Sequence, residues 1–301
     1  MDLGYDKPLY ILAFDHRGSF QKKFFGVTGR PTPEEAARIS DAKTVIFEGL
    51  LHALDEGVPR EAAGALVDEQ FGADIARKAK ADGLTFAMPV EKSGQDEFDF
   101  EYGEDFGAHI EDFDPSFAKV LVRYNPGGDA ELNARQTDRL RRLSDWLHQR
   151  GRKFLFELLV PPEPSQLEAV GGDAATYDTE VRPGLMRDAI AELQQAGVEP
   201  DIWKIEGIDR REDCEAIAEQ TRAGGRDRVA CVVLGRAAPD EQVDHWLRMG
   251  RGVPGYIGFA IGRSIWWDPL KAYVDGKAKR DDAAKQISAN YRRFIEVYEK
   301  G

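Results

Sequence analysis

The sequence has few cysteines, a deficit of basic residues and no long apolar run. Only two of its 301 residues are cysteines, and both fall in expected secondary structure, so we interpret Cys214 and Cys231 as buried reduced thiols and not as a disulfide. Lysine and arginine number 41 against 54 acidic residues, a net charge of −13 that disfavours nucleic acid or an anionic membrane as a partner, because both need a basic face. No apolar run approaches the ~20 residues of a membrane helix, and the N-terminal residues lack the features of a secretion signal. These absences predict a cytoplasmic protein.

Eight short β-type runs alternate with helical patterns along the chain. The expected strands are residues 9–15, 64–68, 84–89, 118–124, 154–160, 202–206, 229–234 and 256–261. The expected helices are residues 33–54, 71–82, 130–150, 182–196, 210–222 and 239–250. Because parallel strands need crossover connections, this alternation predicts a parallel sheet, and eight units favour closure into one α/β domain, a (β/α)8 TIM barrel over residues 1–301. An open doubly wound sheet is the alternative, but no Gly-rich dinucleotide loop follows the first strand.

Four further segments refine this expectation. Thr32, followed by Pro33 and Glu35, is typical of a capping box at the start of the first expected helix. Residues 90–117 and 161–182 lengthen the third and fifth strand-to-helix connections, which lie on the catalytic face of a barrel, as lids or as solvated decoration. Residues 279–299 are expected to form an amphipathic C-terminal helix that seals the barrel or packs on a partner subunit. Its apolar side carries Ile287, Tyr291, Phe294, Ile295 and Tyr298.

Charged residues interrupt four of the apolar strands, where burial costs several kcal/mol unless the charge is paired or lies near the strand end. In the sixth strand, side chains alternate so that Ile202, Lys204 and Glu206 share one face. Trp203 and Ile205 suit the helix-facing side, which directs Lys204 and Glu206 into the barrel. A buried lysine has a lowered pKa and becomes a nucleophile towards a ketone. On this strand alone, a plain ion pair with a neighbouring carboxylate is the alternative.

Neighbouring strands place further charges at the same end of the barrel. The fourth strand carries Lys119 and Arg123 on one face, the fifth carries Glu157 and the first ends in Asp15. Since the fifth strand lies between the fourth and the sixth, a Lys119–Glu157–Lys204 arrangement is expected at the mouth. Such a grouping suits imine catalysis, because one cation lowers the pKa of the other amine and the carboxylate transfers protons as the carbinolamine dehydrates.

The ends of the seventh and eighth strands carry matching Gly-Arg pairs, Gly235-Arg236 and Gly262-Arg263. Glycine lets backbone N–H groups approach an anion, and arginine adds charge with several donors. Loops after these two strands are the frequent phosphate site of the barrel fold. A turn with a solvated arginine is the alternative for each pair taken alone, whereas both together indicate a phosphate-bearing substrate.

Five segments in order resemble a known family. They are Phe14-Asp-His-Arg-Gly-Ser19, Lys119-Val-Leu-Val-Arg-Tyr124, Glu157, Asp201-Ile-Trp-Lys-Ile-Glu206 and Gly262-Arg-Ser-Ile-Trp266. Over roughly residues 8–270 the chain resembles the tagatose-1,6-bisphosphate and sulfofructose-phosphate aldolases, which are class I lyases on an α/β barrel. It resembles in particular the aldolase-like domain fused to 5-dehydro-2-deoxygluconokinase in bacterial inositol catabolism. The resemblance implies cleavage of a ketose phosphate, with 2-deoxy-5-keto-gluconate 6-phosphate as the candidate, to dihydroxyacetone phosphate and an aldehyde.

The resemblance also implies roles for individual residues. Lys204 matches the Schiff-base lysine, Glu157 the acid/base, and Lys119 the lysine that polarises the substrate. Asp15 matches the carboxylate that binds substrate hydroxyls, and Arg263 matches the phosphate-binding arginine. From the residues themselves we expect further substrate-binding positions at His16, Arg17, Arg123, Glu206, Gly235, Arg236 and Gly262. The chain departs from the family at His16, where glutamine is usual, at Gly207, where an apolar residue is usual, and at the end of the seventh strand. These departures bear on the substrate and leave imine chemistry in place.

Three other functions remain open. A metal-dependent aldolase needs several histidines at strand ends, but only His16 of the five histidines is so placed, so we expect no metal and no cofactor. A sugar-phosphate isomerase or epimerase would use Glu157 and Asp15 as its acid and base. A non-catalytic barrel would bind a sugar phosphate without turnover. A homo-oligomer is common in the family, and the sequence itself does not fix the oligomeric state.

Overall fold

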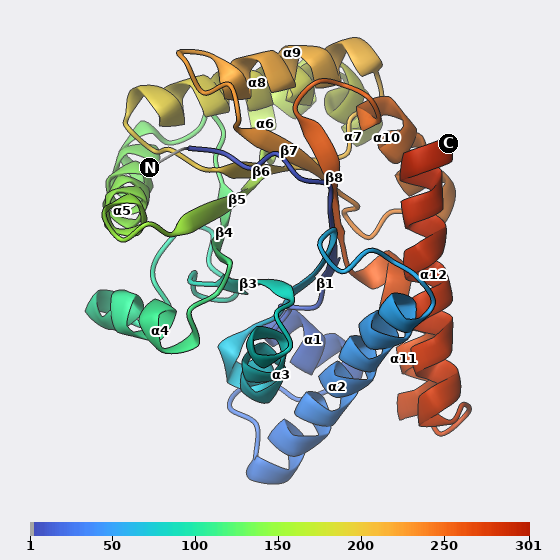
Figure 1. The fold of residues 1–301 in the computed structure, drawn as a ribbon. Coiled ribbons are helices and arrows are strands. Elements are labelled where there is room, and N and C mark those ends of the chain that lie inside the picture. The colour runs from blue at the N-terminus through green and yellow to red at the C-terminus, as the bar shows by residue number, and fades with distance from the viewer. Residues whose placement is uncertain (1–2) are drawn as a thin grey trace.

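The computed structural model describes residues 3–301, and its eight parallel strands form a closed barrel in the order β1 to β8 (Figure 1). The strands are β1 (Leu9–Ala13), β2 (Ala63–Leu66), β3 (Thr85–Pro89), β4 (Phe117–Arg123), β5 (Lys153–Leu159), β6 (Ile202–Glu206), β7 (Ala230–Leu234) and β8 (Tyr256–Ile261). All eight predicted strands are present, with ends that differ by at most two residues. The predicted TIM barrel is confirmed.

Helices surround the barrel, and each predicted helix is also present (Figure 1). They are α1 (Gly18–Phe25), α2 (Pro33–Asp55), α3 (Glu69–Ala81), α4 (Phe106–Phe113), α5 (Ala130–Gln149), α6 (Pro164–Ala169), α7 (Ala174–Thr176), α8 (Arg182–Gln195), α9 (Arg211–Arg222), α10 (Asp240–Gly250), α11 (Arg263–Val274) and α12 (Arg280–Lys300), with a 3₁₀ turn η1 (Gly103–Asp105) and a π turn η2 (Tyr177–Val181). The capping box of α2 is confirmed, since Thr32 accepts a hydrogen bond from the Glu35 N–H and the Glu35 carboxylate accepts one from Thr32.

Five helices of the described chain were not predicted: α4, α6 and α7 in the two insertions, and α1 and α11 after the first and last strands. Helix α1 is only eight residues long, too short for a periodic pattern, and aromatic contacts among Phe20, Phe24 and Trp266 hold it in place. Helix α11 contains Pro269 in its interior, and proline there removes a helical hydrogen bond, so the sequence argues against a helix. No described helix is long and apolar enough to cross a membrane.

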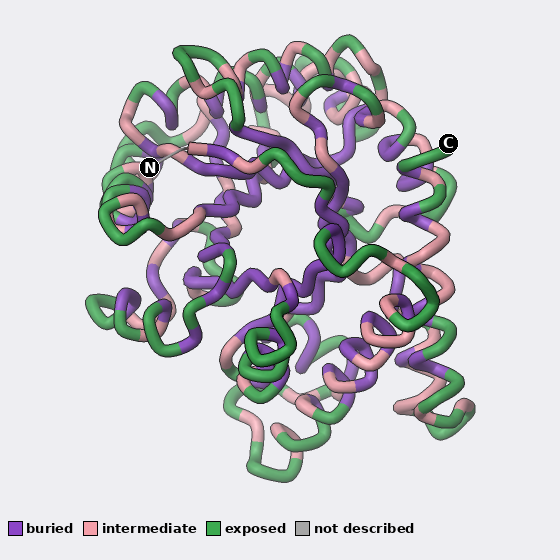
Figure 2. The backbone as a smooth tube through the Cα atoms, viewed as in Figure 1, coloured by how far each residue is buried: buried purple, intermediate pink, exposed green. Residues whose placement is uncertain are grey.

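Each strand has one face towards the barrel interior and one towards the helices, and both are buried (Figure 2). The interior cluster contains small and branched residues, among them Ile11, Leu155, Ile202 and Val232, together with the aromatic Phe117. The alternate residues of the strands, such as Trp203 and Ile205, pack in the larger cluster against the helices, as the sequence predicted. Strand alternation therefore directs the charged residues of the same strands into the barrel.

The N-terminal end of the barrel is closed by the segment that precedes β1. Asp201 is fully buried there and accepts hydrogen bonds from the Gly4 N–H at 2.8 Å and the Lys153 Nζ at 2.8 Å. The ring of Tyr5 meets that of Phe117 edge-on, with 5.3 Å between centroids. Because this end is filled, access to the interior comes from the opposite end, where the strands finish.

Helix α12 packs against α2 and α11 within the chain (Figure 1). All five residues of its predicted apolar side are buried. The Tyr291 hydroxyl donates to the backbone oxygen of Tyr10 in β1, and the Tyr10 hydroxyl donates to Glu299 at 3.1 Å. The C-terminal helix is thus attached to the first strand as well as to the first long helix.

Candidate active site

A cavity of about 620 Å³ opens at the carboxyl ends of the strands. Residues from the ends of β1 and β4 to β8 line it, together with the segment 91–98 and parts of the segment 161–178. The two insertions that the sequence predicted on the catalytic face therefore both contribute to its wall. Every predicted site residue lines this cavity, from Asp15 after β1 to Arg263 after β8.

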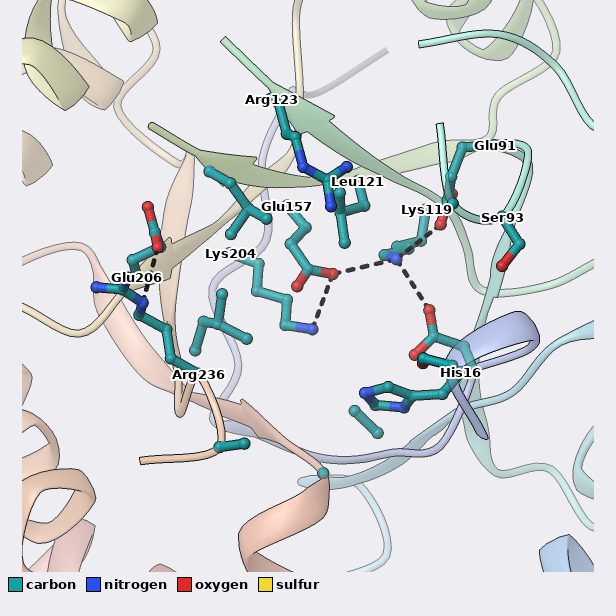
Figure 3. Close-up of a pocket in the computed structure, with 18 of the residues that line it drawn as sticks. His16, Glu91, Ser93, Lys119, Leu121, Arg123, Glu157, Lys204, Glu206 and Arg236 are labelled. Atoms are coloured by element: carbon teal, nitrogen blue, oxygen red, sulfur yellow. Dashed lines mark hydrogen bonds and ion pairs between the residues drawn. The ribbon is translucent and has the colours of Figure 1, made fainter. Parts of the chain in front are cut away.

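A chain of ion pairs runs across the floor of the cavity (Figure 3). Lys204 Nζ lies 3.0 Å from Glu157 Oε2, and the same oxygen lies 3.1 Å from Lys119 Nζ. Lys119 Nζ also donates to Asp15 Oδ2 and to Glu91 Oε1, each at 2.9 Å. The predicted Lys119–Glu157–Lys204 grouping is therefore present, and Glu157 and Lys204 are direct neighbours in the β5–β6 register.

The two lysines of this chain have different surroundings. The side chain of Lys119 is 1% exposed, and three carboxylates surround its ammonium group. Burial alone would lower the pKa of Lys119, but Asp15, Glu157 and Glu91 outweigh it and hold that pKa above its usual range. Lys119 is consequently a fixed cation at neutral pH. Within residues 3–301, Lys204 has Glu157 as its one ion-pair partner.

The three carboxylates around Lys119 also differ from one another, in the direction in which their pKa is shifted. Burial would raise the pKa of Asp15, but Lys119, His16 and Lys204 hold it below its usual range. The pKa of Glu157 is also lowered, because the two lysines outweigh its burial. Burial raises the pKa of Glu91 in spite of Lys119. Asp15 and Glu157 are therefore ionised at neutral pH, and Glu157 is ready to accept a proton.

A buried lysine of α2 holds the loop after β1 in place. Lys43 is fully buried, and its Nζ forms an ion pair with Asp68. The same Nζ donates to the backbone oxygens of Phe14 at 2.8 Å and His16 at 2.9 Å. These two carbonyls flank Asp15, so Lys43 holds the backbone that presents the Asp15 carboxylate to the cavity.

Arg17 belongs to the same loop but points to the third connection. Its guanidinium donates to the Glu91 backbone oxygen at 2.7 Å and to Glu101 at 3.0 Å. Arg123, at the end of β4, donates to the Gln95 backbone oxygen at 2.8 Å. Both arginines hold segment 91–98 against the mouth, and both line the cavity.

The insertion that contains segment 91–98 is also attached to the outer surface. Five arginines of α5 and the residues just after it pair with acidic residues of the insertion. The pairs are Arg135–Glu97, Arg139–Glu97, Arg142–Glu104, Arg150–Glu111 and Arg152–Asp114. This explains the acidic composition of residues 90–117, whose charges are used within the chain.

The two Gly-Arg pairs that the sequence singled out differ in the structure. The Arg236 guanidinium is held by Glu206 at 3.0 Å and by Asp178 at 2.8 Å, and Arg236 has a positive φ of 49°. Among the residues described, no ion pair forms at Arg263, which is half-buried and whose pKa is lowered by burial. Arg263 is thus the arginine with charge to offer an anion, and Arg236 is largely neutralised.

Gly262 and Arg263 begin helix α11, which lies directly over the end of β8. A Cβ at Gly262 would come within 2.3 Å of the Ala13 backbone oxygen, so only glycine fits there. A helix N-terminus presents free N–H groups and a positive dipole end, which favour an anion. This turn therefore has the geometry of a phosphate site.

Glu206 and Gly207 also have structural explanations. Glu206 accepts from the Val160 N–H at 2.9 Å as well as from Arg236, which fixes it at the wall of the cavity. A Cβ on Gly207 would lie 1.8 Å from the Trp246 indole, so this ring excludes the apolar residue that relatives usually carry.

Sequence reasoning missed Glu91, Lys43 and Asp68. Glu91 lies two residues after the predicted strand 84–89, and Asp68 ends the predicted strand 64–68, so the rule applied to the other strand ends would have selected both. Lys43 lies on α2, and nothing in its local sequence connects it to the β1 loop. Within residues 3–301, no three or more His, Cys, Asp or Glu side chains are grouped to hold a metal ion.

Comparisons with known proteins agree with this architecture. A family model described as "Uncharacterized protein conserved in bacteria (DUF2090)" matches residues 5–301. No curated protein gives a significant match. Cgl0159 from Corynebacterium glutamicum (Brevibacterium flavum) is a similar solved structure, with 18% identity, a TM-score of 0.58, and coverage of 96% of this chain and 88% of that chain.

Two further similar structures are fructose-bisphosphate aldolases. An archaeal fructose 1,6-bisphosphate aldolase is 12% identical, with a TM-score of 0.60 and coverage of 98% of this chain and 94% of that chain. A Schiff base forming fructose-1,6-bisphosphate aldolase is 13% identical, with a TM-score of 0.57 and coverage of 95% and 94%. At these identities the likeness shows a shared fold over nearly the whole chain.

Proposed function

The chain belongs to the DUF2090 family, and we propose that it is a class I aldolase, a lyase that cleaves a ketose phosphate through a Schiff base on Lys204. The observation that carries the proposal is the position of the Lys204 amine, which lies in the cavity within 3.0 Å of an ionised carboxylate. Two structural neighbours are fructose-bisphosphate aldolases, one of them Schiff base forming, and this supports the proposal.

A lysine must lose a proton before it attacks a carbonyl carbon. Glu157 Oε2 is in contact with Lys204 Nζ and is ionised, so it accepts this proton. The protonated Glu157 then donates to the carbinolamine hydroxyl, which leaves as water when the imine forms. Glu157 therefore transfers the protons that formation of the imine on the Lys204 nitrogen requires.

Lys119 and Asp15 complete the floor of the site. Lys119 remains an ammonium group and offers charge to a substrate oxygen without competing as a nucleophile. Asp15, ionised and facing Lys119, accepts hydrogen bonds from substrate hydroxyls. This division of roles follows from the three carboxylates around Lys119 and the single one beside Lys204.

The phosphate of the substrate is placed at Gly262 and Arg263, where the N-terminus of α11 and an arginine without an ion-pair partner in residues 3–301 meet the cavity. The finer proposal is 2-deoxy-5-keto-gluconate 6-phosphate as substrate, with dihydroxyacetone phosphate and an aldehyde as products. The sequence resemblance alone supports this choice of substrate.

Borohydride trapping tests the proposal directly. The protein is incubated with dihydroxyacetone phosphate, reduced with borohydride and digested, and the modified peptide is located by mass spectrometry. We expect one adduct, on Lys204. Lys153, whose Nζ is bound to Asp201 at the closed end of the barrel, serves as an internal control that stays unmodified.

Two outcomes contradict the proposal. An adduct on Lys119 in place of Lys204 would reverse the roles of the two lysines. No adduct at saturating ketose phosphate would exclude Schiff-base chemistry, and turnover without trapping would then favour a sugar-phosphate isomerase, whereas binding without turnover would favour a non-catalytic barrel.

A further inference from the structure

The β1 loop carries a histidine that the mechanism above does not use. His16 lines the cavity, and its ring points into it from the β1 side (Figure 3). Its Nδ1 atom is buried without a hydrogen-bond partner in the part of the chain that the structure describes. The other ring nitrogen, Nε2, is not buried and forms no hydrogen bond among the described residues, so it is the imidazole nitrogen that faces the cavity and is open to a substrate group.

The ring of His16 is also fixed in orientation. Its backbone oxygen is bound by Lys43 Nζ at 2.9 Å, and its ring meets Trp266 edge-on with 5.6 Å between centroids. On a third side, the position of a Cβ on Gly262 would be 3.3 Å from His16 Cε1. Helix α11 and the turn after β8 thus contact the imidazole, while α2 holds the backbone that carries it.

Cleavage of a carbon–carbon bond through an imine needs proton transfer at two places. One is the nitrogen of Lys204, which Glu157 serves. The other is the hydroxyl on the far side of the bond that breaks, and the carbon that receives the proton afterwards. Glu157 Oε2 contacts both Lys204 and Lys119 on the β5 side, whereas His16 faces the cavity from the β1 side.

We propose that His16 is a catalytic acid/base residue that moves the proton between the substrate hydroxyl and the enamine carbon. This inference rests on the proposed aldolase function. His16 is one of the positions at which the chain departs from the family that it resembles. The inference gives this residue a role in the chemistry itself, beyond contact with substrate.

The step balances in atoms and electrons. Neutral imidazole takes the hydroxyl proton, and the O–H electron pair forms the carbonyl of the departing aldehyde. The carbon–carbon bond breaks, its electron pair forms the enamine double bond, and the iminium π pair moves onto the Lys204 nitrogen. The imidazolium then gives the same proton to the enamine carbon, which restores the iminium, and water hydrolyses it to release the ketone.

The charges around His16 suit this role. Burial lowers the pKa of His16 to about 4, with Arg263, Lys204 and Lys43 adding to the effect and Asp15 opposing it. The imidazole is therefore neutral at pH 7 and accepts protons. A phosphate dianion at Arg263 offsets one of the three cations, so substrate binding raises the pKa of His16 and makes it a stronger base at the moment it is needed.

Hydrogen exchange isolates the step. With dihydroxyacetone phosphate in D₂O, the enzyme exchanges a hydrogen on the hydroxymethyl carbon beside the carbonyl, which NMR measures, while borohydride trapping measures the imine separately. For His16→Gln we expect trapping at the wild-type level and exchange slowed by about 100-fold or more. His52→Gln, at a partly exposed position of α2 that does not line the cavity, is the matched control and keeps the wild-type rate.

A second variant keeps the inference testable if glutamine disturbs the loop. His16→Ala opens space beside the cavity, and added imidazole is expected to restore exchange. The wild-type exchange rate is expected to fall as the pH is lowered through the pKa of His16. The midpoint should lie above 4 when the ketose phosphate is bound. His16→Gln should lack this pH dependence.

The outcomes separate the two proposals. Trapping together with exchange within about threefold of wild type in folded His16→Gln would overturn the role of His16 and leave the aldolase proposal standing. Loss of both trapping and exchange in that variant would make His16 a binding residue and equally overturn the inference. No trapping in the wild-type protein would overturn the aldolase proposal itself.

Discussion

Two buried lysines lie on opposite sides of the β1 loop and have opposite surroundings. Lys43, outside the barrel, is fully buried, and its ammonium group donates hydrogen bonds to Asp68 and to two backbone oxygens. Lys204, inside the barrel mouth, is nearly as buried, with 4% of its side chain exposed, but has Glu157 as its one ion-pair partner in residues 3–301. Burial is therefore no guide to reactivity. The number of partners around the amine distinguishes a structural lysine from a nucleophile.

The largest expected effect is on catalysis at Lys204. Lys204→Met removes the nucleophile, so we expect the borohydride adduct to disappear and the cleavage rate to fall by about 10⁴-fold or more. Glu157 keeps its ion pair with Lys119, so the melting temperature should stay near that of the wild-type protein. Mass spectrometry and thermal unfolding by circular dichroism measure the two effects. A cooperative loss of fold would show that Lys204 is structural, like Lys43.

The same substitution at Lys43 is expected to act on stability. Lys43→Met leaves the Asp68 carboxylate buried without its cation and frees two backbone oxygens, which costs about 3–5 kcal/mol of unfolding free energy. Urea unfolding measures this loss. If Lys43→Met is as stable as the wild-type protein, the contrast between the two lysines fails.

How far the sequence predicts this contrast depends on strand geometry. The alternation of side chains in β6 predicts that Lys204 lies inside the barrel. The order of the strands in the barrel fold predicts that Glu157 lies beside it. Lys43 lies on a helix, and its contact with the β1 loop depends on how α2 packs, which no local pattern gives. For the same reason the sequence did not show that Arg236 is neutralised by Asp178, a residue of a distant insertion.

A smaller effect is expected at the anion site. Arg263→Gln removes one charge-assisted contact, worth about 1.5–3 kcal/mol, so KM for a phosphorylated ketose should rise by roughly 10- to 100-fold with a smaller change in kcat. Dihydroxyacetone without phosphate is the control substrate, and its weak binding should not change. Equal losses for both substrates would place the phosphate elsewhere.

The smallest effect concerns pH. The pKa of Asp15 in the folded protein lies below that of an unfolded aspartate, about 4. The stability that this group contributes is therefore present above pH 4 and is lost as the pH falls below it. We expect Asp15→Asn to cost about 1–2 kcal/mol at pH 7 and to flatten the fall in stability below pH 4, measured by urea unfolding. An unchanged slope would mean that other carboxyl groups cause the acid instability.

The closure of the barrel has a consequence for how the protein is made. Strand β1 pairs with β8, so residues 9–12 cannot complete their strand pairing until residues 258–261 have been made. Helix α12 then covers both β1 and α2. Until β8 and α12 have left the ribosome, the first strand exposes an unpaired edge and an uncovered aromatic face. Long-range contacts of this kind slow folding and favour aggregation of incomplete chains. Chaperone demand during synthesis should thus be set by residues 256–300, far along the chain from Lys204 and Glu157.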